Sequence, residues 1–151
     1  MFSPALMPIA ILCMFQVQTL EKLPKTVGEA YEVLAHTGTF TDGPIGIAGA
    51  TPIEHQAFVL LLKDPQAESY FDRLLAHGSL PGKLYALCGI HFVNRQKLHS
   101  VSLPFSSMHT KVETMNGCLI SYEKCSALIP NILSGESTRS ILNTVNRSRK
   151  A

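Results

Sequence analysis

The sequence has no tryptophan, few charged residues and almost no net charge. The near absence of net charge excludes the largest class of functions. Charged side chains make up 16% of the 151 residues, and 13 Lys plus Arg against 11 Asp plus Glu leave a formal net charge of +2. A surface that binds nucleic acid normally carries a basic stripe. We therefore expect no nucleic-acid partner.

Motifs for common catalytic chemistry are also missing. Glycine-rich phosphate loops are absent from the sequence, and Glu54-His55 lacks the second histidine that a zincin site requires. In the segment from Gly78 to Gly82, Pro81 occupies the variable place of a nucleophile elbow and no strand precedes it, so a turn is predicted. These shortages favour a protein without enzymatic activity and without a cofactor.

The N-terminus has an apolar run without charge, and Glu21 and Lys22 are the first charged residues. This run is shorter than the roughly 20 apolar residues of a membrane-spanning helix and contains Pro4 and Pro8. It fits the hydrophobic region of a signal peptide. Residues 1–18 are therefore expected to be a signal peptide or membrane-targeting leader, which is the chain's only expected contact with a membrane.

Two features of this leader depart from the usual signal pattern. Lys and Arg are absent before the apolar run, and Gln16 and Gln18 occupy the place of a small-residue cleavage site. A cytoplasmic protein with an N-terminal core helix is therefore the alternative to export. A lipid anchor on Cys13 is a further alternative, although Leu12 stands where lipoprotein signals carry a small residue.

The rest of the chain is predicted to form one domain. Residues 19–25 form a linker, 26–135 a single α-rich globular domain, and 136–151 a C-terminal helix or a flexible basic tail. The predicted fold class is mainly α (α+β), with short antiparallel helical hairpins and a C-terminal β-hairpin.

Start and stop signals define the predicted helices. Thr26 and Glu29 form a capping box, Thr51-Pro52 opens a second helix, and Asp64-Pro65 opens a third that closes at Gly78. The run from Lys83 to Val93 is apolar on almost all sides, as expected of a central buried helix. The predicted helices cover residues 26–38, 52–63, 65–77, 83–93, 95–101, 124–133 and 138–145, and Pro104 is expected to end the fifth.

Strand signals appear in two places. Alternating residues around Asn116-Gly117 predict a β-hairpin near 111–122. A short strand is predicted at 45–48. Because an isolated hairpin is marginally stable in water, it must pack on the helices or pair with that strand.

The segment from Leu80 to Ile90 is similar to the second-helix pattern of HEAT-like repeats, within a chain whose order of elements resembles small exported bacterial proteins of unknown function. The likeness covers residues 51–103, about a third of the chain. It implies helical hairpins formed by successive helices and a binding scaffold without chemistry of its own.

Cys88 and His91 are the strongest candidates for chemistry. They lie three residues apart on the predicted central helix, where two side chains can share a face. Such a pair supports a nucleophilic thiol with an imidazole base, or half of a metal site. The other half of a metal site has to come from Cys118, Cys125 or His109, whose spacing matches no standard zinc framework, so no metal is expected.

Export changes what the cysteines are expected to do. Removal of the leader leaves Cys88, Cys118 and Cys125, and an oxidising compartment favours pairing of two of them. Cys88–Cys118 is preferred because it joins distant segments, and Cys118–Cys125 is the alternative. Either bridge is expected to stabilise the fold by roughly 2–4 kcal/mol.

The sequence leaves three functional hypotheses. The first is a non-enzymatic exported domain that binds an unidentified protein or envelope component, in the periplasm, at the envelope or outside the cell. The second is a thiol- or metal-dependent activity at Cys88 and His91. The third is a carrier of a small apolar ligand, which requires a cavity under the hairpin.

Overall fold

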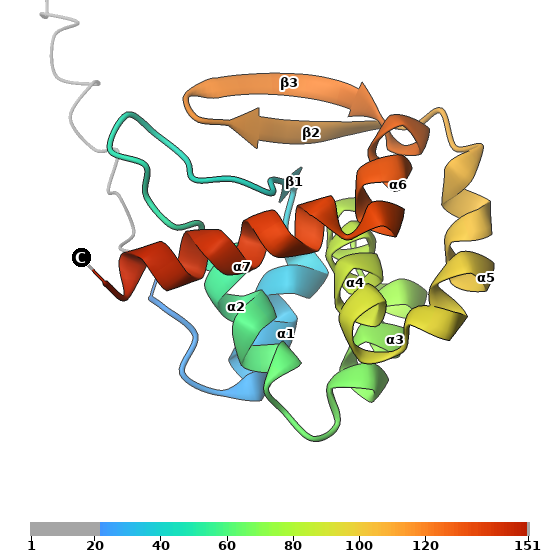
Figure 1. Ribbon diagram of the computed structural model, residues 1–151, viewed down its shortest axis with the longest axis horizontal. Helices are drawn as coiled ribbons and strands as arrows, with labels where there is room; N and C mark the ends of the chain where they lie inside the picture. The colour runs from blue at the N-terminus through green and yellow to red at the C-terminus, as the bar shows by residue number, and fades with distance from the viewer. Residues whose placement is uncertain (1–21, 151) are drawn as a thin grey trace, which may run out of the picture.

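A computed structural model describes residues 22–150 of the chain, which form seven helices and one three-stranded sheet (Figure 1). The predicted mainly α fold with a C-terminal β-hairpin is confirmed. In chain order the elements are α1 (Val27–His36), β1 (Thr39–Phe40), α2 (Ile53–Leu62), α3 (Ala67–His77), α4 (Leu80–Val93), α5 (Arg95–Ser106), β2 (Lys111–Asn116), β3 (Leu119–Lys124), α6 (Cys125–Ser134) and α7 (Glu136–Ser148). The predicted leader, 1–18, lies outside the described residues, and none of the described helices is long and apolar enough to cross a bilayer.

Helix α4 is the centre of the fold, as its apolar sequence predicts. It packs against every other described helix, and its residues from Leu84 to Ile90 are fully buried or nearly so. The helix starts at Leu80, three residues before the predicted start, because the Ser79 hydroxyl caps it by accepting a hydrogen bond from the Gly82 amide. One buried core therefore surrounds α4.

The helices pair differently from the hairpins expected of HEAT-like repeats. Helix α1 packs on α2, and α3 packs on α4, whereas α2 makes only limited contact with α3. The expected pairing of α2 with α3 is therefore a minor contact, because α2 packs mainly on α1 and also on α7. Helix α7 lies along the front of the molecule in Figure 1 and buries Ile141 and Val145, so residues 136–148 are part of the core and not a flexible tail.

The capping box at the start of α1 is confirmed. The Glu29 amide donates to Thr26 Oγ1 at 3.2 Å, and the Thr26 amide donates to the Glu29 carboxylate at 3.2 Å. At α2 the predicted Thr51 cap is wrong, because Thr51 Oγ1 points instead to the carbonyl of Thr144 on α7. Here a tertiary contact competes with the local cap.

The sheet brings β1, which follows the first helix, beside the later hairpin, in the order β1-β2-β3. Strand β1 pairs with β2 in parallel, with Phe40 opposite Thr114, and β2 pairs with β3 as the predicted antiparallel hairpin. The hairpin's two-residue loop is Gly117-Cys118, one residue later than Asn116-Gly117, and Gly117 supplies the positive φ of 57°.

The strand predicted at 45–48 is wrong. Residues 45–50 form a turn that touches the hairpin through a single bridge between Ile45 and Gly117, and β1 takes the expected place beside β2. Phe40 explains the difference, since its ring packs 4.9 Å from that of Tyr85 in the core while Ile47 is fully exposed.

Helix α5 continues to Ser106, past the predicted end before Pro104. Phe105 is buried, so packing of the last turn on the core offsets the hydrogen bond that Pro104 cannot donate.

Candidate functional site

Cys88 and His91 lie on α4 as predicted, but their side chains have separate surroundings. Cys88 is fully buried, and its carbonyl accepts a hydrogen bond from Thr138 Oγ1 at 3.1 Å. The His91 ring packs against Gly135 at the junction of α6 and α7, so closely that a Cβ on that glycine would overlap the ring. Within the described residues no hydrogen bond joins the Cys88 thiol to the His91 ring, and His91 Nδ1 has no partner.

The pKa shifts of Cys88 and His91 do not favour nucleophilic chemistry. Burial raises the pKa of the Cys88 thiol to about 12, whereas a reactive cysteine needs a lowered pKa. Burial, followed by the nearby Arg95 and Arg139 charges, lowers the pKa of His91. Both groups are therefore uncharged at neutral pH and act as packing residues in this arrangement.

The three cysteines in the described part of the chain are free thiols. Cys88 and Cys125 are buried, and Cys118 is exposed in the hairpin loop, so neither predicted bridge is present in the structure. Residue Cys13, the lipidation candidate, lies outside the described residues. Among residues 22–150, no group of three or more His, Cys, Asp or Glu is placed to hold a metal ion, and His109 joins none.

An electrophilic thiol probe is expected to separate these cysteines in a Cys13→Ser background. Cys118 reacts at the rate of an exposed thiol, while Cys88 and Cys125 react slower by about two orders of magnitude or more, because labelling requires opening of the core. Mass spectrometry of peptides after timed labelling measures each rate, and Cys118→Ser removes the fast phase. Rapid labelling of Cys88 in the folded protein would contradict its burial and support a reactive thiol at this position.

A buried polar junction that the sequence did not reveal lies between β1, α2 and α4. The Thr41 carbonyl accepts hydrogen bonds from His55 Nε2 at 2.7 Å and from the Tyr85 hydroxyl at 2.9 Å, and Tyr85 also accepts from the Thr41 amide. Because a carbonyl only accepts, His55 carries its proton on Nε2. The junction anchors the start of the loop that connects β1 to α2 and touches the hairpin at Gly117.

His55 is held as the neutral imidazole by this junction. Its side chain has no exposed surface, and within the described residues its Nδ1 has no hydrogen-bond partner. Burial lowers the pKa of His55 to about 4. In the sequence, His55 stands out only as part of the pair Glu54-His55, which is not a zincin motif, and no local pattern indicates that Thr41 and Tyr85 lie beside it.

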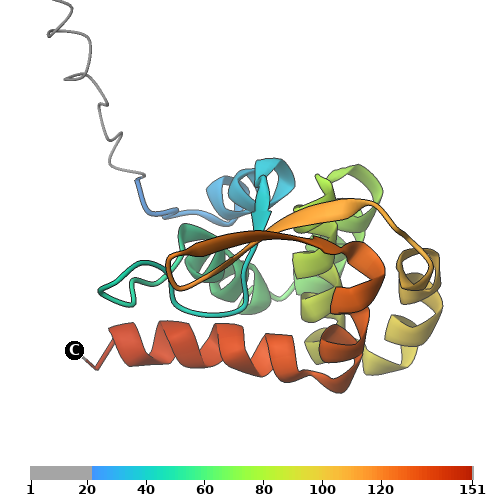
Figure 2. The ribbon, with the colours of Figure 1, turned by 90° about the horizontal axis from the view of Figure 1, so that it is seen from above.

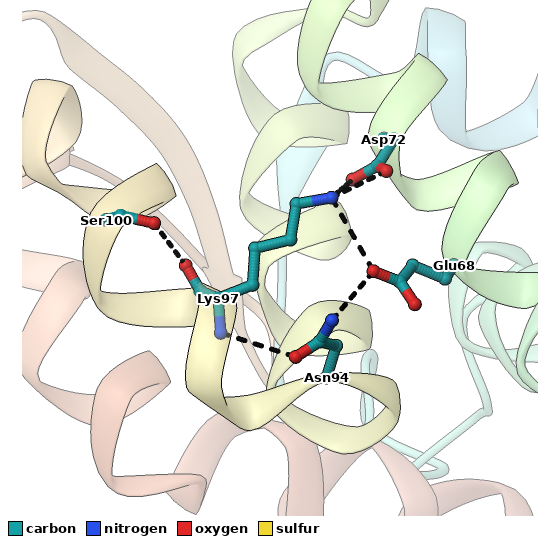
Figure 3. Close-up of polar contacts among 5 residues, drawn as sticks. All are labelled: Glu68, Asp72, Asn94, Lys97 and Ser100. Carbon is teal, nitrogen blue, oxygen red and sulfur yellow. Dashed lines mark hydrogen bonds and ion pairs between the residues drawn. The ribbon is translucent and has the colours of Figure 1, made fainter.

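A second polar cluster ties α3 to α5 at the surface (Figure 3). Lys97 Nζ lies 2.6 Å from both carboxylate oxygens of Asp72 and 3.6 Å from Glu68 Oε1, which also accepts from Asn94 Nδ2 at 2.8 Å. The bond to Asp72 raises the pKa of Lys97, whereas a lysine that acts as a base or nucleophile needs a lowered pKa. The cluster is therefore a structural tie between helices.

Lys97→Met is expected to lower the free energy of unfolding by less than about 1 kcal/mol, because the three charged side chains are partly exposed. The loss shrinks in high salt, which screens the ion pairs. Urea unfolding at low and high ionic strength measures both effects, with Lys63→Met on the exposed end of α2 as the control. A loss of several kcal/mol, or one that salt leaves unchanged, would contradict this assignment.

The β-hairpin has the largest group of exposed apolar side chains in the described part of the chain. Leu119 is 75% exposed, Ile120 58% and Tyr122 62%, and no residue of β3 is buried. Ile47, 98% exposed, lies in the loop whose Gly46 amide donates to Gly117 O at the hairpin tip. In Figure 1 the hairpin forms one border of the molecule, with β3 on the outside.

The space beneath the hairpin is small and polar. A cavity of about 200 Å³ lies between the sheet and α6, and its lining includes Asp42, Asn116, Glu123 and Asn131. Ligand pockets are commonly about 300–1,000 Å³ and mostly apolar. This geometry gives no support to the hypothesis of an apolar-ligand carrier.

The fold and these sites define a small α+β domain whose exposed feature is a sheet edge. Comparison of the chain with protein-family models, curated proteins and solved structures finds no match in any of the three.

Proposed function

We propose that this chain is a non-enzymatic, exported domain that acts by binding another protein or envelope component through its β-hairpin. The observation that carries the proposal is the exposure of Leu119, Ile120 and Tyr122 on a strand that no described element covers. Soluble proteins tend to bury large contiguous apolar surfaces, and exposed ones commonly mark interaction sites.

The hairpin also has the rigidity that a binding surface needs. The Thr41 hydroxyl donates to the Met115 carbonyl at 2.7 Å, and the Tyr122 hydroxyl donates to Glu113, which accepts from Thr39 as well. The exposed side chains are therefore presented by a strand whose neighbours are fixed to the core.

Photo-cross-linking in the host cell tests the binding surface. One variant carries a photo-cross-linking residue in place of Ile120, and the control carries it in place of Leu103, which is similarly exposed on α5. We expect a discrete cross-linked product from position 120 that Tyr122→Ser, a change on the same face, weakens, and none from position 103. Equal products from both positions, or none from position 120, would contradict the proposal.

Export is tested separately by cell fractionation and mass measurement of the mature protein. We expect a mass that lacks the leader, or carries lipid on Cys13, in a fraction outside the cytoplasm. The full-length mass in the cytoplasm would overturn export and leave the hairpin proposal to its own test.

A further inference from the structure

Along the free edge of β3, backbone groups have no hydrogen-bond partner among the described residues. Residues that flank a two-residue hairpin loop form a hydrogen-bonded pair, and such pairs alternate along an antiparallel ladder. Asn116 and Leu119 flank the loop, so the backbone groups of Ile120 and Tyr122 point away from β2. The Met115 carbonyl, opposite Ile120, bonds to Thr41 on the other side, which agrees with this alternation.

Proline and bulges, two of the devices that normally protect an unpaired strand, are absent from this edge, and its charged residues, Glu123 and Lys124, stand at one end. Natural edges are blunted by proline, bulges or charged side chains. The stretch from Leu119 to Tyr122 has no proline and no charge, and its pairing with β2 runs without a bulge from one end to the other. The edge is therefore open to a further strand.

Two lysines stand at one end of the same face. Lys111 and Lys124 are directly opposite each other, so their side chains lie on the same face as Ile120 and Tyr122. Both are exposed, and neither forms an ion pair with any described residue. Like charges directly opposite are unfavourable, and an anionic partner relieves that repulsion.

Glu113, which lies on the same face, already accepts hydrogen bonds from Thr39 and Tyr122, and a second copy of this chain does not place a carboxylate opposite the lysines. Side chains alternate between faces along a strand, so Glu123 and Lys124 lie on opposite faces of the sheet. Symmetric antiparallel pairing of two β3 strands across their free edges places same-face residues opposite each other, and Glu123 then never faces the partner's lysine. Charge complementarity therefore favours a different chain.

We propose that the free edge of β3 binds one extended segment of another protein, with apolar residues at alternate positions and acidic residues at one end. The segment adds a fourth strand beside Ile120 and Tyr122, and its carboxylates meet Lys111 and Lys124. Strand addition gives affinity through backbone hydrogen bonds and specificity through alternate side chains. This inference rests on the proposed function and specifies its partner.

Selection from a display library of short random segments tests the proposal on the purified full chain. The wild type is compared with the double variant Lys111→Glu/Lys124→Glu and with Lys63→Glu, which makes the same kind of charge change on the exposed end of α2. We expect the wild type and the control to enrich acidic segments with alternating apolar residues. The double variant binds those segments about tenfold more weakly or worse and enriches basic ones instead.

The outcomes separate this inference from the function on which it rests. Enriched segments whose affinity falls on Ile120→Thr but does not change when the two lysines are replaced would show that the partner is not acidic. Binding through the hairpin would still stand. Selection without any segment that depends on Ile120 would overturn both. If the double variant does not fold, Lys111→Gln/Lys124→Gln and the salt dependence of wild-type binding replace it. An affinity for the enriched segments that falls neither on these substitutions nor in high salt would overturn the inference.

Discussion

Acidification from pH 6.5 to pH 4 is expected to remove roughly 3 kcal/mol of the free energy of unfolding through His55. The folded protein lowers the pKa of this histidine from 6.5 to about 4, chiefly by burial. The unfolded chain therefore takes up a proton in this range while the folded protein does not. Stability is fully present above pH 6.5 and falls as the pH drops toward 4.

The variant His55→Gln separates this effect from general acid unfolding. An amide N–H in place of Nε2–H can still donate to the Thr41 carbonyl, but the side chain does not titrate. We expect urea unfolding between pH 7 and pH 4 to show a shallower loss for this variant. Some slope remains because burial also lowers the pKa of His91. Equal slopes in both proteins would contradict the assignment of His55 as a buried neutral group.

Gly82→Ala is expected to lower the free energy of unfolding by roughly 1–3 kcal/mol. Gly82 lies in the first turn of α4, where a Cβ would overlap the carbonyl oxygen of Leu34 on α1. Backbone atoms cannot rotate away as a flexible side chain can, so α1 and α4 have to move apart. Thermal and urea unfolding measure the loss.

Gly28→Ala is the matched control. Gly28 is a helical residue of α1, and the nearest atom to its added Cβ is Thr26 Oγ1 at 3.9 Å. The substitution is expected to raise stability by about 0.4–1 kcal/mol, because alanine restricts the unfolded chain. A Gly82→Ala variant with the same free energy of unfolding as the wild type would show that stability does not depend on the close approach of α1 to α4.

The sequence predicted the elements that depend on local chemistry. The capping box of Thr26 and Glu29, the alternation around Gly117 and the all-round apolar pattern of α4 each express a preference within a few residues. These preferences agree with the tertiary packing, so the fold class followed from them.

Predictions that depend on distant contacts were wrong. Thr51 bonds to α7 instead of capping α2, burial of Phe105 carries α5 past Pro104, and the ring of Phe40 selects β1 in place of the strand at 45–48. None of these partners lies nearby in the sequence. A single sequence therefore does not show at which positions tertiary packing overrides the local preference for a cap, a helix end or a strand.

The candidate sites show the same division. Cys88 and His91 lie on the central helix as predicted, and the apolar pattern of that helix already indicated a buried thiol, but no local pattern indicated that the imidazole packs on Gly135. The hairpin was predicted, but the exposure of Ile120 and Tyr122 was not, because it depends on which described elements pack over β3 and not on residue type.

The most direct test of binding at the β3 edge is amide hydrogen exchange, residue by residue, with and without a segment enriched by the wild-type protein. We predict that the amides of Ile120 and Tyr122 become protected when the segment binds, while those of Leu119 and Ser121, already bonded within the hairpin, change little. Protection that appears on the helices and leaves Ile120 and Tyr122 unchanged would contradict the account.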